Sequence, residues 1–233
     1  MNNTFDVRVY PIEDPKGSTL AFANVTFKAD GEDFAAICGI RVMDSTNGLF
    51  VSMPKSKDKD GGFHDIAFPL SKELRLELNT AVLGEYETQA RLEAGQRGYE
   101  KPEPSQTSSL CADDVALDVR VFPIKEPQGS TLAFASIGFS VGGEDLLAIR
   151  GIRVVDSEKG VFVSMPQSKG SDGDYHDVAF PLSGDLRKAL NKSVLAEYDK
   201  HGERAHTDEE DAGGKERSSP RAARARRPAA VKG

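Results

Sequence analysis

The chain of 233 residues has room for two modest domains, each with a hydrophobic core of its own. Apolar residues make up 38% and charged residues 29% of it, as in average globular protein, and no apolar run approaches the roughly 20 residues that cross a bilayer. The opening residues do not resemble a secretory signal, and the two cysteines do not suggest a disulfide framework. We therefore expect a cytoplasmic protein that does not associate with membranes.

The formal net charge of −7 is unevenly distributed. Residues 5–87 carry 9 basic and 14 acidic side chains, and residues 117–199 carry 9 and 12. Residues 200–233 carry 9 basic and 6 acidic side chains. The sequence thus predicts acidic folded segments followed by a basic tail.

Residues 5–87 align with residues 117–199 without a gap, at a displacement of 112 positions. Roughly three positions in five are identical, and most others exchange similar residues. Two copies are too few for a solenoid, so the duplication indicates two globular domains. We place the first domain at 1–94, a linker at 95–116, the second domain at 117–200 and a disordered basic tail at 201–233.

Each repeat begins with a β-rich half. Alternating apolar and polar residues predict a half-buried strand over 6–12. The β-rich runs 19–28 and 34–43 flank Asp30-Gly31-Glu32 and predict a hairpin. A turn over 44–48 then leads into a short apolar strand over 49–53.

The second half of each repeat is predicted to end in a helix. Pro54 closes the preceding strand, a polar loop is expected over 55–62 and another short strand over 63–68. Ser71 is a good N-cap, and apolar residues then recur at helical spacing, namely Leu74, Leu78, Ala81, Val82 and Tyr86. The same pattern recurs 112 positions later.

The predicted fold class is therefore α+β, with two tandem copies of a small antiparallel β-sheet domain that each end in one helix. One helix covers only one face of such a sheet and leaves an edge open. Because both units are on one chain, their effective concentration for each other is high. We expect an intramolecular pseudo-dimer of the two repeats.

Two strings in the first repeat carry a family resemblance. The first is Gly39-Ile40-Arg41-Val42 followed by Gly48-Leu49-Phe50-Val51-Ser52-Met53-Pro54, and the second runs from Asp60 to Pro69 as DGGFHDIAFP. Both recur in the second repeat, at 151–154, 160–166 and 172–181. On these strings the chain resembles the SpoVG septation-regulator family of bacteria over nearly all of both repeats.

The resemblance implies small, dimeric, non-enzymatic proteins that bind DNA or RNA and influence septation, sporulation and gene expression. It places the nucleic-acid contacts in the loop after Met-Pro and on nearby strand cations. In this sequence those residues are Lys55, Lys57, Lys59, His64 and Arg41 in the first repeat, and Lys169, His176 and Arg153 in the second. Gln167 and Ser171 replace two of the lysines, and histidines stand where the family usually has Arg or Lys.

The residues alone leave two interpretations of this loop open. Lysines neutralise phosphates and release counterions, but a short charged loop is also a normal solvated surface. The pairs His64-Asp65 and His176-Asp177 each lack the converging ligands of a metal site, so a hydrogen-bonded strand histidine is the simpler interpretation. We expect no metal, no cofactor and no catalytic residues, since no phosphate-binding or nucleophile motif occurs.

The tail contains Arg221, Arg224, Arg226 and Arg227 among Ala, Pro and Ser. Arg-rich disordered segments add non-specific affinity for nucleic acid. The acidic run 208–211 offers an alternative, a solvated segment in which opposite charges neutralise each other. The sequence therefore favours a non-catalytic regulator that binds DNA or RNA, with an adaptor for division or regulatory proteins as the alternative.

Overall fold

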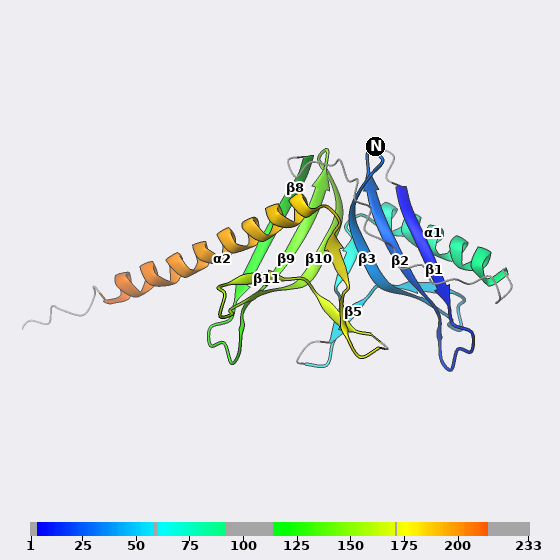
Figure 1. Ribbon diagram of the computed structural model, residues 1–233, viewed down its shortest axis with the longest axis horizontal. Coiled ribbons are helices and arrows are strands. Elements are labelled where there is room, and N and C mark those ends of the chain that lie inside the picture. Colours follow the sequence, from blue (N-terminus) through cyan, green and yellow to red (C-terminus); the bar gives the residue numbers. More distant parts are fainter. Residues whose placement is uncertain (1–3, 58–59, 92–113, 171, 214–233) are drawn as a thin grey trace, which may run out of the picture. The chain divides into compact units, whose positions relative to one another are not determined.

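The computed structural model describes residues 4–57, 60–91, 114–170 and 172–213 (Figure 1). Both repeats lie within one compact unit, Met1–Asp199. The predicted linker falls almost wholly outside the described residues, and so does most of the predicted tail.

The first repeat forms an antiparallel sheet from four strands, β1 (Thr4–Pro11), β2 (Thr19–Ala29), β3 (Glu32–Met43) and β4 (Phe50–Ser52). A tight turn joins β2 and β3. Asp30 and Gly31 both take positive φ, 50° and 85°, so they form the two-residue turn of the predicted hairpin. In β2 every second residue from Ala21 to Ala29 is buried, which gives this sheet one face toward the core.

The second repeat builds the same sheet from β8 (Val115–Pro123), β9 (Thr131–Val141), β10 (Glu144–Val155) and β11 (Phe162–Ser164). Gly142 and Gly143 form the matching turn, with φ of 58° and 87°. The predicted fold class, two tandem α+β domains with one helix each, is confirmed.

Two predictions for the segment after Pro54 were wrong. The expected polar loop contains a strand, β5 (Lys55–Lys57), and the expected single strand over 63–68 is two strands, β6 (Phe63–Asp65) and β7 (Ala67–Pro69). All three β5 side chains are exposed, so no apolar alternation marks that strand in the sequence. The equivalent strands are β12 (Gln167–Lys169), β13 (Tyr175–Asp177) and β14 (Ala179–Pro181).

The two repeats are joined by exchanged strands. β7 of the first repeat pairs with β10 of the second, with Phe68 opposite Ala148. β14 of the second repeat pairs with β3 of the first, with Phe180 opposite Ala36. Hydrogen bonds extend each pairing: the Arg150 N–H donates to Ile66 O at 2.7 Å and the Leu70 N–H to Leu146 O at 3.1 Å. Each sheet therefore gains its fifth strand from the other repeat.

A glycine marks the point at which β3 changes its partner. β3 pairs with β14 through Ala35–Ile37 and with β4 through Arg41–Met43. Between these segments the register against β2 shifts, and Gly39 has φ of 75°. Its N–H donates to Asn24 Oδ1 at 3.3 Å. Gly151, with φ of 74°, occupies the same place in β10.

The helices are α1 (Lys72–Arg91) and α2 (Gly184–Gly213). The predicted N-cap is present, because Ser71 Oγ accepts the Leu74 N–H at 3.0 Å and Ser183 Oγ accepts the Leu186 N–H at 3.3 Å. Leu74, Leu78 and Val82 are buried, as are their counterparts in α2. No helix in the described ranges is both long and apolar enough to span a bilayer.

One hydrophobic core runs through both repeats. The Phe27 and Phe34 rings lie 6.1 Å apart, and Phe34 lies 6.4 Å from Phe139 of the second repeat. The buried leucines of both helices belong to the same cluster. Separation of the repeats would expose this core, so we expect the two repeats to unfold together in the full chain.

Candidate nucleic-acid interface

The segment after each Met-Pro forms a two-stranded ribbon rather than a loop. β5 pairs with β6 and β12 pairs with β13, and both ribbons extend from the same side of the two sheets (Figure 1). In the first ribbon Lys57 lies opposite Phe63, and in the second Lys169 lies opposite Tyr175. Phe63 is 65% exposed and Tyr175 is 67% exposed. Each ribbon thus presents one lysine beside one solvent-exposed ring.

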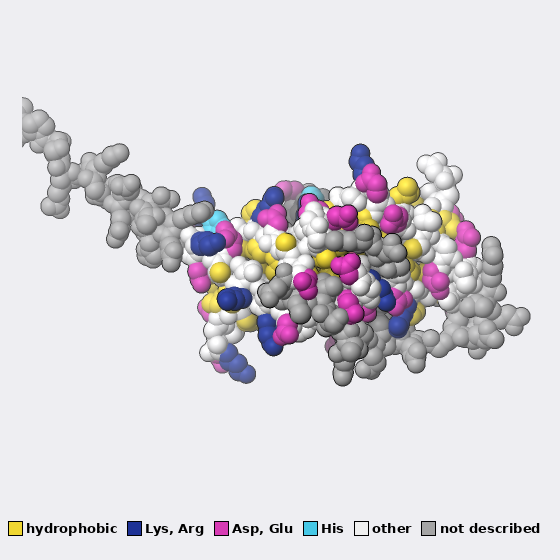
Figure 2. Space-filling view, turned by 90° about the horizontal axis from the view of Figure 1, so that it is seen from above, with side chains coloured by type: hydrophobic (Ala, Val, Ile, Leu, Met, Phe, Trp, Pro, Cys, Tyr) yellow, Lys and Arg dark blue, Asp and Glu magenta, His cyan; other side chains and the backbone are white. Residues whose placement is uncertain are grey.

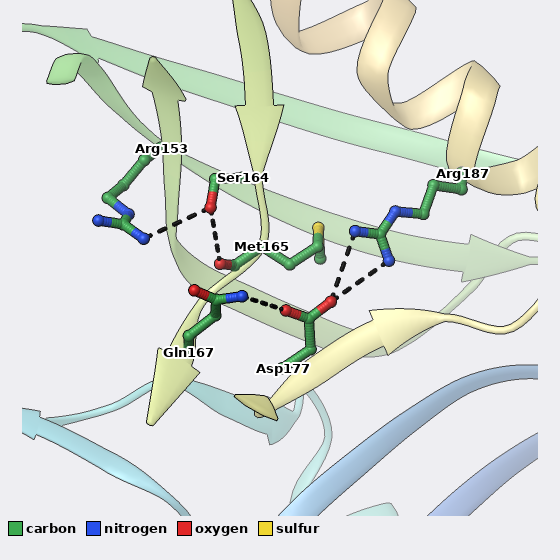
Figure 3. A network of polar contacts seen from close by, with 6 residues as sticks. All are labelled: Arg153, Ser164, Met165, Gln167, Asp177 and Arg187. Atoms are coloured by element: carbon green, nitrogen blue, oxygen red, sulfur yellow. Dashed lines mark hydrogen bonds and ion pairs between the residues drawn. The ribbon is translucent and has the colours of Figure 1, made fainter. Parts of the chain in front are cut away.

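An ion pair fixes the base of each ribbon to a helix. Arg187 of α2 donates through both terminal nitrogens to Asp177 Oδ2, each at 3.4 Å, and Asp177 also accepts from Gln167 Nε2 at 2.9 Å (Figure 3). In the first repeat Arg75 contacts Asp65 Oδ2 at 3.3 and 3.4 Å. The aspartates of the two His-Asp pairs therefore position the ribbons.

The two ribbons differ in charge at their bases. Lys55 stands opposite Asp65, whereas Gln167 replaces it opposite Asp177. The first ribbon therefore carries two exposed lysines in its described residues and the second carries one. Lys59, which was also predicted to contact nucleic acid, lies outside the described residues.

The ribbon histidines are exposed strand residues, opposite Ser56 and Ser168. His176 Nε2 lies 2.7 Å from Asp172 Oδ2, and this hydrogen bond, together with the Asp174 N–H, holds the pKa of Asp172 below its usual value. Among the described residues no group of three or more His, Cys, Asp or Glu side chains is arranged to hold a metal ion.

The predicted strand cations Arg41 and Arg153 lie on β3 and β10, at the strand end next to β4 and β11. Both are partly exposed. A terminal nitrogen of Arg153 donates to Ser164 Oγ at 3.4 Å, and Ser164 leads through Met165 into the second ribbon (Figure 3). Each arginine thus lies opposite the serine that precedes Met-Pro and the following ribbon.

The predicted tail residues Arg221, Arg224, Arg226 and Arg227 lie outside the described residues. Seen from above in Figure 2, where the ribbons of Figure 1 point away from the viewer, Asp and Glu side chains are spread among the basic ones. That face therefore shows no continuous basic patch in its described part.

Sequence reasoning missed the exposed aromatic residues. Beyond Phe63 and Tyr175, the sheets expose Phe22, Phe122 and Phe134. The signal was present, because each of the last three occupies the outward position of an alternating strand whose inward positions are buried or partly buried. An exposed ring beside a cation is a common feature of nucleic-acid interfaces.

The fold defines a class of α+β protein in which two small domains exchange a strand and each presents a short ribbon. The SpoVG family model matches residues 1–88 and 115–200, which is most of the chain and both repeats. The chain belongs to the SpoVG family.

Curated relatives resemble one repeat each. The protein named "Putative septation protein SpoVG 2" of Listeria monocytogenes is 38% identical over 90 residues, which are 39% of this chain and 83% of that protein. The SpoVG protein of Acetivibrio thermocellus is 43% identical over 83 residues (36% and 83%), and that of Myxococcus xanthus is 36% identical over 84 residues (36% and 79%). One such relative therefore corresponds to about half of the duplicated region.

Proposed function

We propose that this protein is a non-enzymatic regulator that binds DNA or RNA in the cytoplasm through its two ribbons. The observation that carries the proposal is the pairing of Lys57 with Phe63 and of Lys169 with Tyr175 on two ribbons that extend from one side. The names of its relatives support septation as the process that it regulates. Sporulation is a further candidate process, taken from the family resemblance alone.

The physical support is electrostatic. Each lysine that contacts a phosphate releases condensed counterions, so binding falls with salt in proportion to the number of contacts. The exposed rings add contact area that can pack on sugars or bases. Because the folded repeats are acidic, binding depends on a small number of local cations, among which we include Arg41 and Arg153, and the imidazoles of His64 and His176 serve as further polar contacts.

The first prediction uses the difference in charge between the ribbons. Changing Lys55, Lys57 and Lys59 together to Gln should lower the slope of log affinity against log salt by about 2–3. The single change Lys169→Gln should lower it by about 1 at most. Fluorescence anisotropy with labelled DNA and RNA across a salt series measures both slopes. Lys188→Gln, on an exposed lysine of α2, is the matched control and should leave the slope unchanged.

Equal losses from the two ribbons would contradict the assigned asymmetry. A second arm removes residues 215–233, and we expect part of the slope to disappear while the melting temperature stays the same. If the wild-type chain binds neither DNA nor RNA at low salt, the proposed function is wrong.

The alternative function is an adaptor for division or regulatory proteins. A specific observation favours it: both repeats expose an apolar pair at the same turn, Leu49-Phe50 and Val161-Phe162, each residue 40–45% exposed. Exposed apolar pairs rimmed by polar residues are typical of protein-binding surfaces. Absence of any nucleic-acid binding would make this the leading function.

A further inference from the structure

The outer face of the second repeat's sheet carries a row of aligned side chains. Phe122 on β8 lies opposite Phe134 on β9, and Phe134 lies opposite Arg153 on β10. Directly opposed residues of antiparallel strands project to the same face. Phe122 is 56% exposed and Phe134 is 46% exposed. Two solvent-exposed rings and a guanidinium therefore share one sheet face.

A groove of about 260 Å³ continues from this row along the same strands. Its floor includes Ser136 and Gly138, which follow Phe134 at every second position of β9. Its wall is formed by Phe68 and Leu70, which reach it from the first repeat through the exchanged β7. The groove therefore exists only because the repeats exchange strands.

The groove is bordered by two arginines, Arg120 and Arg150, and by two aspartates, Asp118 and Asp145. The Arg150 guanidinium stacks over the Phe68 ring, 4.7 Å from its centroid, and Arg120 lies opposite Ser136. Arg120 is ion-paired with Asp118 at 3.2 Å. Among the described residues, no carboxylate lies within ion-pair distance of Arg150 or Arg153. These two cations are therefore available to an anionic ligand, Arg153 in line with the aromatic row and Arg150 three residues earlier on β10, beside the groove.

We propose that this face binds a stretch of unpaired nucleotides, with bases stacked on Phe122 and Phe134 and phosphates held by Arg150 and Arg153. The proposal rests on the proposed function and specifies its ligand as single-stranded nucleic acid. Unpaired bases have free faces that stack on aromatic rings, whereas the bases of a duplex are already stacked on one another. The groove beside the row accommodates the nucleic-acid strand where it leaves the two rings. Ser164, which accepts a hydrogen bond from Arg153, connects the row to the second ribbon.

The first repeat supplies an internal comparison. Its outer face has a similar row, with Tyr10 opposite Phe22 and Phe22 opposite Arg41. The positions equivalent to the groove differ, because Thr26 replaces Gly138, Lys28 replaces Ser140 and Cys38 replaces Arg150. Lys28 is ion-paired with Asp33 at 3.3 Å. The second sheet is thus the stronger site, and the first serves as a control.

The test measures binding of the full chain to three labelled probes by fluorescence anisotropy. The probes are a 15-nucleotide poly-dT strand, a 15-base-pair duplex and an abasic strand of equal charge. The variant Phe122→Ala/Phe134→Ala should weaken poly-dT binding roughly tenfold or more, since each stacked ring contributes substantially to affinity. Its salt slope should not change, because no charge is removed. Phe22→Ala should weaken binding no more than about twofold.

A second variant closes the groove without disturbing the fold. Gly138→Thr introduces the residue of the first repeat, and an added Cβ there would meet Asp118 and Leu70 only at ordinary contact distances of 3.6 and 3.9 Å. Thr also favours strands more than Gly does, so the melting temperature should hold or rise. Poly-dT binding should weaken at least threefold.

The outcomes separate this proposal from the proposed function. Binding of poly-dT that is unchanged in both variants, or a wild-type preference for the duplex, would overturn the single-strand site and leave nucleic-acid binding by the ribbons intact. Equal weakening of poly-dT and abasic binding would overturn base stacking. If the wild-type chain binds none of the probes, the proposed function fails, and this site fails with it.

Discussion

Among single residues, the equivalent aspartates Asp65 and Asp177 have a role that becomes clear only from their contacts in the structure. Each follows a histidine, and the sequence favours a hydrogen-bonded strand histidine over a metal ligand but assigns no role to the aspartate. In the structure each carboxylate accepts from an arginine in the first turn of the following helix. The pair is partly exposed, so its contribution to stability is modest, about 1 kcal/mol or less. Its main effect is to fix the direction in which the ribbon leaves the sheet.

The hydrogen bond between His176 and Asp172 gives a pH-dependent prediction. The pKa of Asp172 is lower in the folded chain than in the unfolded chain. Its stabilising effect is therefore present above the unfolded pKa and is lost as the pH falls through the folded pKa. His176→Ala should raise the Asp172 pKa toward its usual value, as followed by carbon NMR of the side-chain carboxyl group. His64→Ala, in the other ribbon, is the control and should leave it unchanged.

An unaltered Asp172 pKa in His176→Ala would mean that the Asp174 N–H, at 3.0 Å, accounts for the shift alone. The Asp172 side chain is 53% exposed, so its hydrogen bond contributes little to stability, and we expect His176→Ala to change the melting temperature at neutral pH only slightly.

Among the secondary-structure elements, the bulges in β3 and β10 decide how each sheet is shared. A regular strand would keep one neighbour along its whole length. The register shift at Gly39 and at Gly151 instead lets the strand pair with its own repeat on one side of the bulge and with the exchanged strand on the other. Bulges are a recurrent way to bend a strand and end a pairing.

The position of Gly39 in the bulge predicts that a side chain added there strains the backbone without a steric clash. Gly39 has φ of 75°, and no atom lies within 4 Å of the point that an alanine Cβ would occupy, so Gly39→Ala adds strain without a clash. It should lower the free energy of unfolding by about 1–2 kcal/mol. Gly138→Ala is the matched control, because Gly138 lies in a regular strand without positive φ, and it should be neutral or stabilising. Urea denaturation measures both, and equal effects would contradict the role given to Gly39.

In the whole molecule, the strand exchange makes the two repeats depend on each other, so they are more than two binding domains joined by a linker. Each repeat lacks the fifth strand of its sheet and part of its core, and the other repeat supplies both. Within one chain the exchange is an intramolecular event at high effective concentration. It also permits the two halves to diverge, as they have in the ribbons and at the sheet groove.

The architecture predicts opposite assembly states for the full chain and for one repeat. We expect the full chain to sediment as a monomer. Residues 1–91 alone should form a dimer by reciprocal exchange of β7, with a melting temperature that rises with protein concentration. Analytical ultracentrifugation and thermal melts at several concentrations measure this. A stable monomeric repeat, or independent melting of two domains in the full chain, would show that the exchange is dispensable.

Several residues of the candidate site were predictable from the sequence, but the ribbon that carries them was not. The strings after Met-Pro identified Lys55, Lys57 and Lys169 because charge and motif are properties of the sequence. The same segment was predicted to be a loop, since a ribbon with both faces in solvent carries no apolar alternation. The outward rings Phe122 and Phe134 were visible as alternate positions of strands but were assigned no role.

The sequence by itself determined the duplication, the α+β class and the capped helices, because repeats, strand alternation and capping depend on residues close together in the chain. Only the tertiary structure decided that β7 and β14 cross to the other repeat and that Phe68 completes a groove on a sheet some 80 positions away in sequence. Three-residue strands have no local feature that selects a partner. The choice is made by the open edge of a bulged strand and by the shared core that its pairing buries.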